Sequence, residues 1–310
     1  CPTLSQHYAQ HLASLEGERR QMNQEINKML SAYALGTHIS AIHALKEIIQ
    51  ALTLHTLSKT DFFSHAAFYG DTALRIFHGL DRFSEDMDFS LKTKDENFNL
   101  EAYLPAIEQG LNSYGLEMSV LSKKKQHSSN VQSAFLKANT VIHLVKITAM
   151  TPPLSGIPNN ALIKIKIEVD TNPPGGAEYE RKFQLLPQPY SVLVYDRPSL
   201  FAGKLHALLC RNWKQREKGR DFYDYVWYLT EGVPVNIHHL EQRMRQSGHW
   251  YMEVPLTLEV VKEKLLNRFE SLEFQAVKQD VTPFIPNPSV LDIWDKEFFS
   301  AITRDQLKGN

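Results

Sequence analysis

The chain has 310 residues, of which 43% are hydrophobic and 22% charged, and its formal net charge is −1. The length and composition are typical of a globular chain that forms one large domain or two. The net charge excludes nucleic-acid binding by overall positive charge, so any RNA contact needs a local basic patch. Two cysteines are too few for a disulfide framework, and no run of about 18 apolar residues is present. We therefore expect a cytoplasmic protein with no membrane partner.

Residues 1–60 are expected to form an N-terminal helical segment. Two helical stretches, about 6–33 and 38–58, are separated at Gly36. The second stretch has apolar residues at spacings of three and four, which is typical of a helix with one buried face. The first stretch is polar and charged, so it is either an interaction arm or a helix packed on the body with a solvated outer face.

Residues 61–196 are expected to form the core, with residues 68–91 at its centre. An apolar run ends at Gly70, a helical segment follows as far as Gly79, and a second apolar run contains Asp86 and Asp88. On a strand, alternate side chains share a face, so these two carboxylates would lie close together and attract a hard cation such as Mg²⁺. The backbone N–H groups at Gly70, beside a helix N-terminus, would accept an anion. An Asp-x-Asp pair alone is also common as solvated strand-edge residues.

The next part of the core alternates between helix and strand signals. A helix is predicted over 99–114, with Asn99 as its N-cap and Gly115 as its stop. Strands are predicted at 116–122, 131–137 and 140–149. The basic residues at 123–127 are either a contact for a nucleic-acid backbone or a charged hairpin turn.

Residues 161–170 alternate strictly between apolar and polar side chains, which predicts an amphipathic strand. Its polar face carries Lys164, Lys166, Glu168 and Asp170. A strand face exposed to water would have the same pattern. Two further short strands are predicted over 179–195.

Residues 197–310 are expected to form a helical C-terminal domain, because Pro198 suits a first helical turn and the pattern beyond it is helical. Asp221 and Asp224, three residues apart, share a helix face, and Arg220 can reach Asp224. The alternative is a salt-bridged surface helix.

Four motifs carry a resemblance to a known family. They are Gly-x-Thr-Ala-Leu-Arg at 70–75, Gly-Leu-x-Arg-Phe-Ser-Glu-Asp-x-Asp-Phe-Ser-Leu at 79–91, Lys-Leu-x-Ala-Leu at 204–208 and Lys-x-Arg-Asp-x-Tyr-Asp at 218–224. Together they resemble the AbiEii/AbiGii nucleotidyltransferases, toxins of bacterial type IV toxin–antitoxin and abortive-infection systems. The resemblance spans roughly residues 62–230. One departure is Asp71, where the family usually has a second Gly or a Ser.

The resemblance implies an α+β fold: a nucleotidyltransferase-like mixed β-sheet core with flanking helices, followed by a helical C-terminal lobe. It implies Mg²⁺ ligands at Asp86, Asp88 and Glu168, with Asp170 as the alternative third carboxylate. The implied catalytic residues are Asp86, Asp88, Lys204 and Asp221. The implied nucleotide-binding residues are Gly70, Asp71, Thr72, Arg75, Ser84, Lys166, Arg220 and Asp224.

The implied reaction is Mg²⁺-dependent transfer of an NMP from an NTP to an RNA, tRNA-like, or protein acceptor, with one or two metal ions. The implied partner is a cognate antitoxin that acts on expression of the toxin. Three alternatives remain: an NTP-using phosphotransferase on the same fold, a metal-dependent nuclease, and a nucleotide-binding pseudoenzyme. Asp71 favours the last, because it adds negative charge near a presumed triphosphate.

Overall fold

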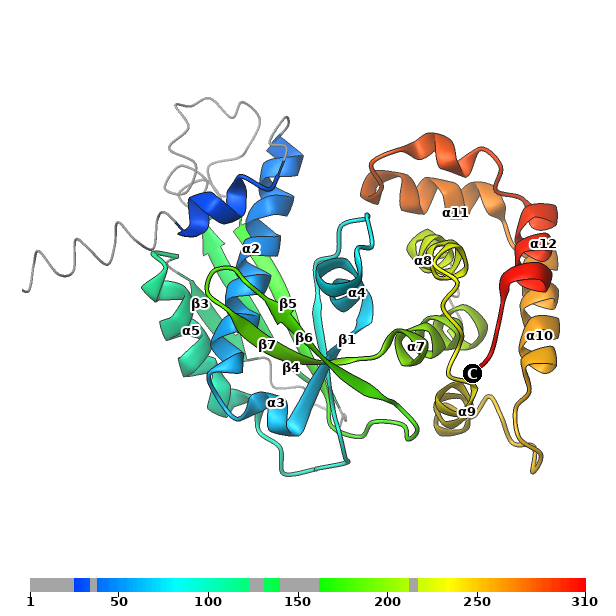
Figure 1. Ribbon diagram of the computed structural model, residues 1–310, viewed down its shortest axis with the longest axis horizontal. Helices are drawn as coiled ribbons and strands as arrows, with labels where there is room; N and C mark the ends of the chain where they lie inside the picture. Colours follow the sequence, from blue (N-terminus) through cyan, green and yellow to red (C-terminus); the bar gives the residue numbers. More distant parts are fainter. Residues whose placement is uncertain (1–24, 34–37, 117, 123–130, 140–161, 212–216) are drawn as a thin grey trace, which may run out of the picture. The chain divides into compact units, whose positions relative to one another are not determined.

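The computed structural model describes residues 25–33, 38–116, 118–122, 131–139, 162–211 and 217–310 (Figure 1). It divides into two compact units that interleave along the chain. The first unit comprises 1–66, 85–172 and 181–192, and the second comprises 67–84, 173–180 and 193–310. The predicted division at residues 60 and 196 stays a prediction.

The first unit is built on a seven-stranded mixed sheet with the strand order β3-β4-β5-β2-β1-β7-β6. β1, β6 and β7 continue into the second unit. β2 pairs with β5 in parallel, whereas β3 with β4 and β4 with β5 pair antiparallel. The predicted mixed sheet is therefore confirmed. The strands are β1 (Ala66–Tyr69), β2 (Met87–Leu91), β3 (Ser119–Ser122), β4 (Val131–Asn139), β5 (Leu162–Asp170), β6 (Tyr179–Gln184) and β7 (Tyr190–Tyr195).

β5 shows why the sequence specifies this sheet. Its apolar residues, from Ile163 to Val169, are buried at every second position, and the polar residues between them are exposed or half-buried. Period-two burial holds one face of the strand against the core and leaves the other for polar groups. The expected strand at 140–149 and the basic residues at 123–127 lie outside the described residues.

Helices of the first unit pack beside this sheet. α2 (His38–Ser58) contacts α5 (Leu104–Ser113) and β5, and α3 (Phe62–His65) follows α2 (Figure 1). Asn99 accepts from the Glu101 N–H at 3.0 Å and so caps a 3₁₀ turn, Leu100–Tyr103, that leads into α5. Of the predicted helix at 6–33, residues 25–30 are helical and residues 6–24 lie outside the described residues.

The second unit contains α4, and beyond β7 it is helical, as predicted. Asp196, Asn236, Thr257 and Asp295 each cap a helix by accepting from the N–H three residues further on. Its helices are α4 (Gly70–His78), α7 (Arg197–Cys210), α8 (Gly219–Thr230), α9 (Ile237–Gln246), α10 (Leu258–Glu270), α11 (Phe274–Val281) and α12 (Lys296–Gln306), with 3₁₀ turns at Thr282–Phe284 and Pro288–Leu291.

Aromatic side chains fill the core of the second unit. Phe201 of α7 stacks on Tyr228 of α8, with ring centroids 4.3 Å apart, and Phe299 of α12 packs edge-on against Phe222. This core fixes α7 and α8 against each other, so the polar side chains that they share have defined positions. Within the described ranges, no helix combines the length and apolar character needed to cross a bilayer.

Candidate active site

α4 begins and ends at glycines that adopt left-handed backbone angles. Gly70 starts the helix with φ 81°, and Gly79 ends it with φ 81°, where its N–H donates to the Leu74 carbonyl. A side chain would strain either position. Thr72, in the first turn, donates to the Ser84 hydroxyl at 2.8 Å, and both side chains are buried. This bond ties the segment after α4 back onto the start of the helix.

Lys204, on α7, lies at the centre of a buried charge cluster. Its Nζ is 2.7 Å from Asp71 Oδ1, 2.6 Å from Asp221 Oδ1 and 2.6 Å from Asp224 Oδ2. The contacts with Asp71 and Asp221 are hydrogen bonds donated by the ammonium group, and the contact with Asp224 is an ion pair. The structure therefore brings together four of the predicted site residues from α4, α7 and α8.

Arg82 is a second cation in the same cluster, and the sequence-based prediction gave it no role. Its Nε and Nη2 contact the two oxygens of Asp224 at 2.5 Å each, and Nη2 also lies 2.7 Å from Asp71 Oδ2. The Arg82 side chain is fully buried. The sequence signal that could have indicated a role for Arg82 was its position within the 79–91 motif. That position did not indicate burial, because an arginine in a charged turn is usually solvated.

The charges of this cluster stabilise one another. Burial raises the pKa of Asp71, but Lys204, Arg82 and Lys218 more than offset it, so the pKa of Asp71 lies well below its ordinary value. Burial also raises the pKa of Asp221, and Lys204 and Lys218 more than offset this, so the pKa is lowered. Burial lowers the pKa of Lys204, and its three carboxylates outweigh that and raise it. Asp71, Asp221 and Lys204 are therefore charged at neutral pH.

Burial dominates at Asp224, the most enclosed of the three carboxylates. It raises the pKa of Asp224, and Arg82 and Lys204 offset only part of the rise. Burying the Asp224 carboxylate removes it from water, which has a desolvation cost. Arg82 and Lys204 are both needed to offset that cost.

The carboxylates of Asp71, Asp221 and Asp224 lie close enough together to hold a metal ion. The Lys204 ammonium already contacts all three. A metal ion would have to displace Lys204 and leave its charge buried without a counterion, which is costly. The donor set here therefore fits an internal ammonium better than Mg²⁺.

Two predicted nucleotide-binding arginines make other contacts. Arg75 donates to the Leu80 carbonyl at 3.0 Å, which stabilises the turn after its own helix. Arg220 places its guanidinium 4.2 Å from the centroid of the Phe284 ring. The predicted contact from Arg220 to Asp224 is replaced by Arg82 and Lys204, which take both oxygens of Asp224.

The other predicted carboxylates lie in the first unit. Asp88 on β2 pairs in register with Glu168 on β5. In-register residues of adjacent parallel strands project from the same face, so the two carboxylates are neighbours. Asp88 is half-buried, and Asp86, exposed, lies one residue before β2. Oxygen ligands on neighbouring strands, open to water, are a donor set that suits a hard cation such as Mg²⁺.

Glu168 and Asp170, the two candidates for a third carboxylate, differ in their surroundings. Glu168 forms an ion pair with Lys166 at 2.5 Å, and Lys166 is the predicted nucleotide-binding residue on the same face. Asp170 pairs in register with Ser90, and its Oδ1 accepts from the Asn172 N–H at 2.9 Å. Asp170 thus organises the turn that ends β5, whereas Glu168 lies beside Asp88.

The chain thus combines a mixed sheet that has acidic residues in register on adjacent strands with a helical acid–lysine cluster. The family model described as nucleotidyl transferase AbiEii toxin, type IV TA system, matches residues 52–296. The chain belongs to that family, and the predicted family, toxin class and nucleotidyltransferase activity are confirmed.

Two solved structures from Helicobacter pylori are similar to the chain. One is provisionally assigned as a nucleotidyltransferase: it is 16% identical, with a TM-score of 0.42, over 83% of this chain and 89% of that one. The other is JHP933, 15% identical, with a TM-score of 0.43, over 84% of this chain and 88% of that one. No curated protein matches the chain.

Proposed function

We propose that this nucleotidyltransferase is Mg²⁺-dependent and transfers an NMP from an NTP to an RNA, tRNA-like, or protein acceptor. The observation that carries the proposal is the register of Asp88 with Glu168 on adjacent parallel strands, with Asp86 exposed at the start of β2. Mg²⁺ is usually held by one or two carboxylates together with substrate phosphates.

Asp86 and Asp88 would hold the metal, and Glu168 is the third carboxylate that we propose for a second ion. Bound Mg²⁺ supplies charge neutralisation on the phosphates and lowers the pKa of an attacking oxygen. The protein's own contribution is to hold the carboxylates on rigid strands. Rigid placement matters because phosphoryl-transfer sites act mainly by positioning and electrostatics.

Gly70, Thr72, Ser84, Arg75, Lys166 and Arg220 keep their predicted nucleotide-binding roles as proposals. What supports a role for Gly70 is its left-handed backbone at the N-terminus of α4, where N–H groups are not used within the helix. Arg75 and Arg220 would have to exchange their present partners for phosphate.

Lys204 and Asp221 also keep their proposed catalytic roles, with one constraint from the contacts of Lys204. Lys204 donates hydrogen bonds to Asp71 and Asp221, and it forms an ion pair with Asp224. A triphosphate can therefore contact the Lys204 ammonium only by displacing one of these carboxylates. Asp71 is the candidate, since its side chain is 21% exposed while those of Asp221 and Asp224 are 3% and 0% exposed.

The family also implies a cognate antitoxin. We propose that it acts on expression of this toxin in the cytoplasm. A toxin that consumes NTP and modifies an acceptor would need such control to be tolerated by the cell.

The reaction class is tested by incubating the purified chain and Mg²⁺ with α-labelled or γ-labelled NTPs and separate RNA and protein fractions. Label transferred from the α-labelled NTP alone, and lost when EDTA is added, is the expected result. Transfer of the γ-label would establish the phosphotransferase alternative. RNA cleaved without NTP would establish the nuclease, and NTP binding with no transfer to either fraction would establish the pseudoenzyme.

A further inference from the structure

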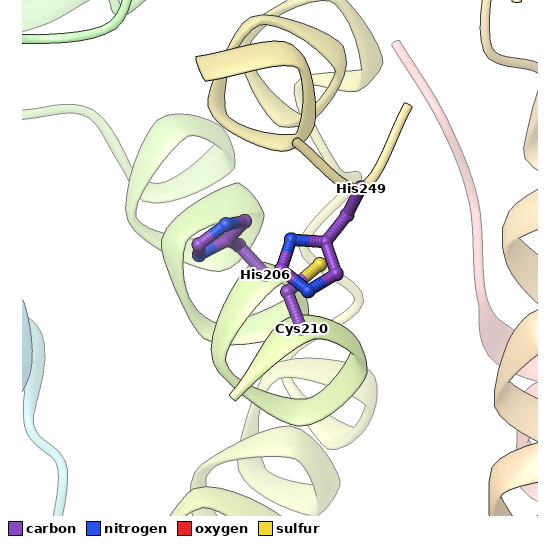
Figure 2. A group of neighbouring side chains, drawn as sticks. All are labelled: His206, Cys210 and His249. Atoms are coloured by element: carbon purple, nitrogen blue, oxygen red, sulfur yellow. The ribbon is translucent and has the colours of Figure 1, made fainter. Parts of the chain in front are cut away.

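A second cluster of potential metal ligands lies in the second unit, where α7 ends near the turn after α9. His206 and Cys210 are one helical turn apart on α7, and His249 follows α9 (Figure 2). A ligand atom from each lies within 4.8 Å of the others. None of these residues belongs to the Lys204 cluster or to the carboxylates of β2 and β5.

From this geometry we propose that His206, Cys210 and His249 form a Zn²⁺-binding site that joins α7 to the turn after α9. Two imidazoles and a thiolate are the ligand types that Zn²⁺ prefers, and water would complete a tetrahedral set. With metal–ligand bonds of about 2.0 to 2.3 Å, tetrahedral donors are about 3.3 to 3.8 Å apart. The ligand atoms, within 4.8 Å of one another, lie near that spacing, and binding would require them to approach further.

Ser247 already organises the two imidazoles. Its Oγ lies 2.8 Å from His206 Nε2 and 3.0 Å from His249 Nδ1. Each ring has a second nitrogen for a metal, and histidine ligands commonly use the other nitrogen for a hydrogen bond that fixes the ring. The site thus has supporting contacts as well as ligands.

The charges around the cluster select the kind of metal. Arg243 and Arg211 lie close enough to His206 to act on it electrostatically. The Cys210 thiol must lose its proton to bind a metal ion. Binding would release the thiol proton to solvent as the metal–sulfur bond forms. A metal ion beside two arginines needs a negatively charged ligand, which the Cys210 thiolate supplies. A thiolate ligand favours Zn²⁺ over Mg²⁺ or Ca²⁺.

The test uses the full chain, freed of metal with a chelator and titrated with Co²⁺, a spectroscopic probe for such sites, and then with Zn²⁺ in competition. The expected result is one equivalent of Co²⁺ with a sulfur-to-metal charge-transfer band, which Zn²⁺ abolishes. Cys210→Ser should remove the band. His249→Ala should weaken Zn²⁺ binding at least tenfold, because it removes one of three protein ligands.

His238→Ala is the matched control, because His238 is an exposed histidine on α9 outside the cluster. It should bind Zn²⁺ as the original chain does. His249 is also exposed, so its variant is expected to fold even if Cys210→Ser, at a buried site, does not. The absence of the charge-transfer band in the original chain, or equal Zn²⁺ affinity in the two histidine variants, would overturn the proposal. Neither result depends on nucleotidyl transfer.

Discussion

Arg82 and Asp224 form a bidentate ion pair, with the Nε and Nη2 atoms of the arginine 2.5 Å from the two carboxylate oxygens. Both side chains are fully buried. The pair joins the segment after α4 to α8, two parts of the second unit that are 142 residues apart in the chain. Lys204 contacts the same carboxylate, so each charge in the cluster depends on the others.

Asp224→Asn should therefore destabilise the chain strongly. The substitution keeps the shape of the side chain but leaves Arg82 and Lys204 without one of their counterions. Breaking a buried ion pair on one side typically costs about 3 to 5 kcal/mol. Chemical denaturation of the full chain measures the change. Glu231→Gln is the control, because its pair with Arg197 is 3.8 Å long and 45% exposed on both sides, and should change stability by less than about 1 kcal/mol. Equal effects of the two substitutions would contradict a cooperative cluster.

Asp71→Ser should have opposite effects on stability and on NTP binding. The Asp71 carboxylate occupies one donor of Lys204 and one of Arg82. Its removal leaves those donors to a triphosphate, so we expect NTP to bind up to about tenfold more tightly, which is about 1.4 kcal/mol. Stability should fall by about 1 to 3 kcal/mol, because buried donors lose a partner. Titration with labelled NTP measures the affinity, and weaker NTP binding by a folded variant would show that Asp71 does not compete with phosphate.

Local features of this fold were predictable from the sequence, because each depends on residues close together in the chain. Period-two alternation specified β5, Gly79 specified the end of α4, and Pro198 near the start of α7 marked the change to helices. The pairing of Arg82 with Asp224 was not predictable, because nothing local distinguishes a buried arginine from one in a solvated turn. The spacing of His206 and Cys210 was visible in the sequence, but their proximity to His249 depends on how α7 and α9 pack.

The candidate site shows the same limit. The acidic residues of β2 and β5 were found from their motif and alternation. Their register is a property of strand pairing, and it places Glu168 rather than Asp170 beside Asp88. The predicted members of the Lys204 cluster were found as separate residues on three helices. Its closed set of contacts, which makes Lys204 an internal counterion, required the packed structure.

His239 should make the stability of the chain depend on pH. Its Nδ1 lies 2.7 Å from the Gly175 carbonyl, and its Nε2 is buried with no partner among the described residues. Burial first, and then Arg243, lower its pKa from 6.5 to about 4. Between these values the unfolded chain binds a proton that the folded chain does not, so stability is retained above about pH 6.5 and lost as the pH falls toward 4.

The loss attributable to His239 is at most about 3.4 kcal/mol, because lowering its pKa from 6.5 to about 4 corresponds to about 1.36 kcal/mol for each pH unit. Denaturation curves at several pH values measure it. His239→Asn, which keeps a donor for the Gly175 carbonyl but does not titrate, should flatten this part of the profile. An unchanged profile in that variant would assign the pH dependence to other groups.

The most direct test of the central claim is NMP transfer from α-labelled NTP by variants of the carboxylates on β2 and β5. Asp86→Ala and Asp88→Asn should each reduce transfer at least about a hundredfold, because a metal ligand supplies several kcal/mol to the transition state. Glu168→Gln should also reduce transfer, whereas Asp170→Asn, which keeps an acceptor for the Asn172 N–H, should stay within about threefold. Thermal unfolding of each variant confirms that it is folded. Full transfer by folded Asp86→Ala or Asp88→Asn would contradict the account.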